Sequence, residues 1–125
     1  MNKLFSTLLL SVTLATFGGA AAAHMEHGQP QFGGVVAEGG IAQFEVVSKD
    51  GKVTVYVTSH GAPVSTAGAS GKLTALVGTA KSEIELKPLG ENQMAGAGDI
   101  PSGAKMLVSI QLSGQKPLQA RAVAK

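Results

Sequence analysis

The sequence contains no cysteine and no tryptophan, and its aromatic side chains are four phenylalanines and one tyrosine. Without cysteine the chain can form no disulfide and offers neither a nucleophilic thiol nor a thiolate metal ligand. Charged residues make up only 14% of the sequence, so it lacks the basic stripe that nucleic-acid binding requires. A hydrophobic core must therefore be built from Val, Leu, Ile and Ala.

Residues 1–23 have the pattern of a secretory signal peptide. Lys3 supplies the positive charge, Leu4–Phe17 is mostly apolar, and Ala20–Ala23 offers the small residues that signal peptidase requires. The apolar run is shorter than the roughly 20 residues that span a bilayer. We therefore expect an exported, periplasmic protein that is not inserted in the membrane after signal cleavage.

Cleavage is predicted after Ala23, with cleavage after Ala22 as the alternative, and it leaves roughly 100 residues, enough for one domain. Loss of Lys3 leaves nine basic and eight acidic side chains, a net charge of +1. This charge gives no reason to expect nucleic acid or an anionic membrane surface as a partner. Residues 24–32, rich in Gly, Gln and Pro, are expected to be a flexible lead-in, followed by a β domain over 33–125.

Alternating apolar and polar residues predict β-strands throughout the mature chain. Val53–Thr58 alternates valine with hydroxyl-bearing residues, and Asp50-Gly51 just before it favours a two-residue hairpin turn. The expected strands are Ile41–Ser48, Lys52–Ser59, Lys72–Val77, Ser82–Lys87, Gln93–Ala97, Lys105–Leu112 and Leu118–Val123. Seven or eight short strands predict a single antiparallel Ig-like β-sandwich, in architecture only, because the Cys and Trp of antibody domains are absent.

Among the polar and sulfur-containing residues, two have positions that suggest a structural role. Met106 alternates with Val108 and is expected in the core. Glu45 lies between Phe44 and Val46 in a strand centre, so we expect it to be partly buried and structural. No carboxylates are paired at a spacing that implies acid–base catalysis, and no nucleophile motif is present, so the chain is not expected to be an enzyme.

The candidate metal ligands are concentrated at the predicted cleavage point. If His24 becomes the first residue, its α-amine and imidazole can chelate Cu(II) through two nitrogens. His27 could add a third nitrogen, Glu26 an oxygen, and Met25 a thioether suited to Cu(I). His60, in a turn after a strong strand, could complete the site. The alternative interpretation is a solvated tail with incidental histidines and a turn histidine bonded to local backbone.

The stretch from Phe32 to Leu118 resembles a group of small exported, mostly uncharacterised β-sandwich proteins. The resemblance rests on "FGGVV", on "FEVV" followed by an Asp-Gly hairpin, on "VYV", on the "SHGAPV" turn and on "GASG". That group is similar in turn to the N-terminal β-module of some membrane-fusion proteins of heavy-metal efflux pumps. Phe32 stands where those modules often have His before Gly-Gly, whereas His60 matches their His-Gly turn.

The resemblance and the histidines together predict a periplasmic accessory protein of heavy-metal resistance or efflux. It would bind copper, the first choice, or another transition-metal ion weakly, or dock onto a component of a metal-efflux system. The alternative is an envelope protein-interaction module that binds no metal and presents a sheet edge or a loop to its partner.

Overall fold

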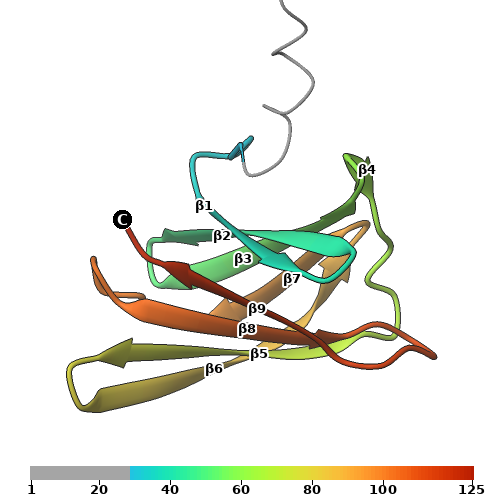
Figure 1. Cartoon of the computed structure of the whole chain (residues 1–125). Coiled ribbons are helices and arrows are strands. Elements are labelled where there is room, and N and C mark those ends of the chain that lie inside the picture. The colour runs from blue at the N-terminus through green and yellow to red at the C-terminus, as the bar shows by residue number, and fades with distance from the viewer. Residues whose placement is uncertain (1–28) are drawn as a thin grey trace, which may run out of the picture.

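The computed structural model describes residues 29–125, which form β-strands joined by turns (Figure 1). The strands are β1 (Val35–Gly39), β2 (Ala42–Lys49), β3 (Lys52–Ser59), β4 (Ala62–Pro63), β5 (Ser70–Val77), β6 (Ala80–Gly90), β7 (Gln93–Ala97), β8 (Lys105–Gln111) and β9 (Leu118–Val123). The predicted all-β class is confirmed for this part of the chain. It contains no helix long and apolar enough to cross a membrane.

Local sequence signals placed most strands correctly. Strands β3, β7 and β9 have the predicted bounds, and Lys49 pairs with Lys52 across the Asp50-Gly51 turn, where φ is 54° and 74°. Positive φ at both central residues is the backbone conformation that a two-residue hairpin favours. Strand β1 was not predicted, because its five residues are too few to establish an alternation between the glycines on either side.

The strands form one antiparallel sheet in the order β2-β1-β9-β8-β5-β6-β7-β3, with the two-residue β4 beside β3. Strands β5, β6 and β7 follow one another as hairpins, and β8 returns to pair with β5. The resulting order β8-β5-β6-β7 is a Greek key. Figure 1 shows these strands curving around a common interior.

The predicted Ig-like sandwich is wrong in architecture, because the sheet closes into an eight-stranded barrel. Strand β2 pairs with β1 on one side and β3 on the other, and β1 also meets β9 through Glu38 and Arg121. Strands β1 and β9 approach so closely there that a Cβ on Gly39 would lie 2.6 Å from the carbonyl oxygen of Gln119. Sandwiches and barrels both bury alternate residues, so the alternation could not distinguish one closed sheet from two open ones.

The barrel interior is filled by aliphatic side chains and a single aromatic ring. Phe44 lies in register with Ala37 on β1 and Val57 on β3, and all three are at most 1% exposed. Met94 and Met106 are also buried, the latter as predicted. An eight-stranded barrel has an interior just wide enough for side chains to fill, so this one contains a packed core.

Replacing Phe44 with Ala should destabilise the barrel strongly, because it removes the one buried ring and leaves a cavity. We expect the free energy of unfolding to fall by about 3–5 kcal/mol in urea denaturation. The matched control is Phe32→Ala, since Phe32 is 51% exposed and its loss should cost no more than about 1 kcal/mol. Equal losses in the two variants would contradict the assignment of the core.

Candidate functional site

His60, the one predicted metal ligand that the structure describes, lies in the turn between β3 and β4. It is exposed and has a φ of 51°, in the left-handed region that histidine enters more readily than most residues. The hydroxyl of Ser59 donates a hydrogen bond of 2.9 Å to the carbonyl oxygen of Ile41. This bond ties the end of β3 to the turn between β1 and β2, so His60 has a fixed place on the barrel.

A hollow of about 180 Å³ brings His60 together with polar side chains from β1 and β2. Glu38 and Gln43 line it from those strands. The Gln43 amide lies 3.4 Å from Oε1 of Glu38. Residues 29–125 hold no group of three or more His, Asp or Glu side chains placed to bind a metal ion. The described part of the hollow thus offers one imidazole and one carboxylate.

The other predicted ligands, His24, Met25, Glu26 and His27, lie outside the described residues, as does the predicted signal peptide of residues 1–23. What the structure does describe is the N-terminal segment, residues 29–34, which leads into β1. In Figure 1 this segment lies above β1–β3, on the outside of the barrel. Three kinds of contact with β2 and β3 hold this segment on the barrel.

Glu45 on β2 binds the backbone of the N-terminal segment. Its Oε1 accepts a hydrogen bond of 2.6 Å from the amide N–H of Gln31, and its Oε2 accepts bonds of 2.7 and 3.0 Å from those of Phe32 and Gly34. The residue is only 7% exposed, although it lies on the outer face. Burying a carboxylate is costly unless hydrogen bonds replace its water, and these three amides supply them.

An aromatic stack adds to the contact between the N-terminal segment and the barrel. The rings of Phe32 and Tyr56 are 3.9 Å apart between centroids and inclined by 12°. Tyr56 lies on β3 directly across from Glu45. Gly34 lets the chain approach the wall, because a Cβ there would lie 2.3 Å from the carbonyl oxygen of Val46. Residues 31–34 are therefore held by hydrogen bonds, by ring stacking and by a close backbone approach.

The N-terminal segment extends from Glu45 toward the turn that contains His60. Gln29 and Gln31 line a small cavity of about 30 Å³ together with Thr58 of β3 and Gly61 of the turn. A cavity of this size has room for about one or two water molecules. Gln43 lines both this cavity and the hollow beside His60, so the two lie next to each other on the outer face.

The other buried polar residue in the described part of the chain has a purely structural position. The hydroxyl of Thr66 lies 3.2 Å from the carbonyl oxygen of Glu91 and 2.9 Å from that of Gln93. It fastens the connection between β4 and β5 to the turn between β6 and β7. Glu45 is therefore the only charged side chain that is buried within residues 29–125.

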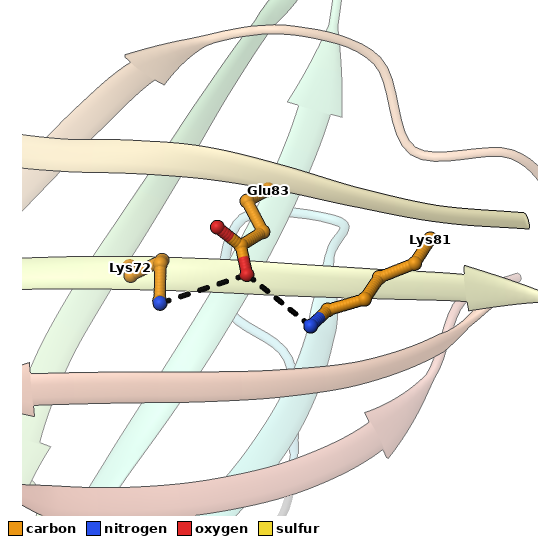
Figure 2. Close-up of polar contacts among 3 residues, drawn as sticks. All are labelled: Lys72, Lys81 and Glu83. Atoms are coloured by element: carbon orange, nitrogen blue, oxygen red, sulfur yellow. Dashed lines mark ion pairs between the residues drawn. The ribbon is translucent and has the colours of Figure 1, made fainter.

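Figure 2 shows a separate cluster of charges on the opposite stretch of the sheet. Glu83 on β6 forms ion pairs with Lys72 on β5, at 3.6 Å, and with Lys81, at 3.4 Å. Each side chain is about half exposed. Exposed pairs of this kind contribute little to stability. Along β6 the exposed Glu83 alternates with the buried Ile84 and Leu86, so this cluster belongs to the solvated outer face of the strand.

Sequence reasoning singled out Glu45 as a partly buried structural residue, and its burial is confirmed. It did not find the partners of Glu45, because hydrogen bonds to backbone amides leave no trace in side-chain identity. The Phe-Gly-Gly stretch was the available signal: a ring for stacking and glycines for a close approach. In the structure that ring, Phe32, stacks on Tyr56.

Replacing Phe32 with Ala should loosen the N-terminal segment while leaving the barrel folded. Tyr56 is the only tyrosine, and the chain has no tryptophan, so tyrosine fluorescence and near-ultraviolet circular dichroism report on this stack directly. We expect both signals to move toward those of free tyrosine. Ile41→Ala, which removes another exposed apolar side chain, is the control. An unchanged tyrosine signal in Phe32→Ala would show that the stack does not form in solution.

The comparisons with known proteins identify no relative. No protein-family model matches the chain, and the searches of curated proteins and of solved structures return no match. The resemblance to the β-modules of heavy-metal efflux proteins therefore stays a prediction, and the function has to be argued from the residues themselves.

Proposed function

We propose that this chain is an exported, periplasmic accessory protein of heavy-metal resistance. It binds a transition-metal ion, with copper as the first candidate, and catalyses no reaction. The ligands would be His24, His27 and His60, with Met25 and Glu26 in support. Imidazole, amine and thioether groups together suit copper in both oxidation states better than a hard cation. A heavy-metal efflux system is the partner that this role implies.

The observation that carries the proposal is the route of the N-terminal segment. Gln29 lines a cavity together with Gly61, the neighbour of His60 in the turn. His27 precedes Gln29 by two residues, and two residues span at most about 7 Å. The proposal is that imidazoles from these two parts of the chain share one ion.

Glu38 and the predicted cleavage add to this support. The Glu38 carboxylate lines the same hollow as His60 and supplies negative charge beside a cation. Cleavage after Ala23 would free an α-amine on His24, which the uncut chain lacks. A six-membered chelate through that amine and Nδ1 of its imidazole would give the tail an affinity of its own.

A protein-interaction module that binds no metal is the second candidate, and one surface favours it. Leu76 on β5 and Val123 on β9 both pair with Lys105 on β8, so they flank this lysine on the outer face. They are 38% and 58% exposed, and the adjacent Val77 is 45% exposed. Apolar side chains set among lysines on a sheet face are suited to an apolar, acidic protein surface.

Metal binding can be tested on the protein as the cell processes it. The full-length gene is expressed with its own N-terminus, the exported product is sized by mass spectrometry, and Cu(II) and Zn(II) are titrated by calorimetry. We expect a product that begins at His24 and a Kd for Cu(II) of about 10 μM or tighter. Tyrosine fluorescence, which reports on Tyr56 alone, should be quenched in the same titration.

Three variants assign the ligands. His24→Ala combined with His27→Ala should weaken Cu(II) binding at least tenfold, about 1.4 kcal/mol. His60→Ala should weaken it by a smaller factor, because the tail keeps its own chelate. Gln29→Ala, which changes the segment but removes no proposed ligand, is the control. A Kd above about 100 μM, or one that the histidine variants leave unchanged, would exclude the metal role and favour the interaction module.

A further inference from the structure

We infer that the end of the barrel at which β5 turns into β6 is a docking surface for an anionic lipid bilayer. The surface has two parts: the hairpin tip, residues 77–80, and a basic row, which consists of Lys81, Leu76, Lys105 and Val123. It contains none of the proposed metal ligands, so the inference goes beyond the proposed function and does not depend on it.

The hairpin tip continues the apolar alternation of β5 past the end of the barrel. Leu73 and Ala75 face the interior and are buried, whereas Val77, the next residue in that alternation, is 45% exposed. Pairing of β5 with β8 ends one residue before Val77, and the other edge of β6 is unpaired at this point. Figure 1 shows the hairpin projecting at the lower left. Val77 therefore has the position of a core residue but no neighbouring strand to cover it.

The basic row lies beside the tip on the outer face and alternates cationic with apolar side chains. Leu76 on β5 pairs with Lys81 on β6 and with Lys105 on β8. On the far side of Lys105, Val123 of β9 completes the row. All four residues are exposed. Because adjacent strands are about 4.8 Å apart, the row sets two amines and two apolar side chains within about 15 Å.

The row has an excess of positive charge. Neither ion pair of the described residues includes Lys105. Lys81 shares the carboxylate of Glu83 with Lys72, so that one negative charge faces two positive ones (Figure 2). The small net charge of the sequence hides this local excess, because it averages over the whole chain. Charge complementarity therefore specifies an anionic partner.

The shape of the surface favours a bilayer as that partner. The row alone would suit an acidic protein surface equally well, but a stable protein interface buries about 800 Å² on each side in a closely packed patch. The hairpin tip instead stands free of neighbouring strands. A bilayer accepts such a projection, because apolar side chains enter the headgroup boundary while the stems of nearby lysines extend to the phosphates.

Co-sedimentation of the metal-free exported protein with lipid vesicles tests the inference. Vesicles of equal parts phosphatidylglycerol and phosphatidylcholine should bind half of the protein at about 1 mM lipid, and pure phosphatidylcholine should bind it at least about tenfold more weakly. Raising sodium chloride from about 20 mM to about 0.5 M should release the protein, because the Debye length falls to a few Å. Hydrogen exchange at residues 76–81 should slow on binding.

Variants at the two ends of the barrel localise the contact. Val77→Ser and Lys105→Gln should each weaken binding to the anionic vesicles about fivefold, through lost apolar contact and lost charge respectively. The matched controls are Leu89→Ser and Lys116→Gln, which alter an exposed apolar residue and an exposed lysine at the opposite end. They should change binding less than about twofold. Val123→Ser alters the row alone and serves if Val77→Ser does not fold.

Three results would overturn the inference. Wild-type protein that stays in solution with both kinds of vesicle has no bilayer surface, and an acidic protein would then be the partner of the basic row. Equal weakening by the tip variants and by the controls would show binding through net charge alone. If inorganic phosphate displaces more protein than chloride does at equal ionic strength, the lysines form a site for a free anion. Metal plays no part in these readouts, so they are independent of the Cu(II) titrations.

Discussion

Closure of the sheet between β1 and β9 is the constraint on which the rest of the molecule depends. With β1 paired to β2 and also set against β9, the aliphatic residues of eight strands face one interior, and no second sheet is needed to cover them. The chain has no cysteine, and residues 29–125 bury only one aromatic ring, so the barrel gains its stability from this enclosure. The outer face is thereby left free of any packing role.

The N-terminal segment makes use of that free outer face. It contributes nothing to the barrel interior, yet it is fastened by a carboxylate, an aromatic stack and a glycine. Each of these contacts comes from a residue whose side chain points outward from β2 or β3, or from the segment itself. Packing the core and placing the segment are therefore separate tasks, and substitutions can alter one without the other.

The sequence was most informative where a single local rule decides the structure. Asp50-Gly51 forms the expected turn, and Ile84 and Leu86 face inward because period two leaves no other arrangement. Closure of the barrel could not be predicted from the sequence. The pairing of Glu38 with Arg121 joins residues 83 positions apart, and no local sequence pattern links them. The burial of Glu45 followed from its apolar neighbours, but its amide partners did not. The four N-terminal candidate ligands lie outside the described residues, so their role rests on chemistry and on chain length.

The long strand β6 has an edge that remains partly unpaired although the barrel is closed. Its first half, Ala80–Leu86, pairs with β5, whereas its pairing with β7 begins only at Lys87. Along this half-open stretch stand Lys81 and Glu83, the charges of Figure 2, and the short β4 ends in Pro63. Natural sheets carry charged residues and proline at edges where a strand of another molecule could pair. Self-association through strand addition is thereby discouraged, so a protein partner would have to recognise side chains on a face or a loop.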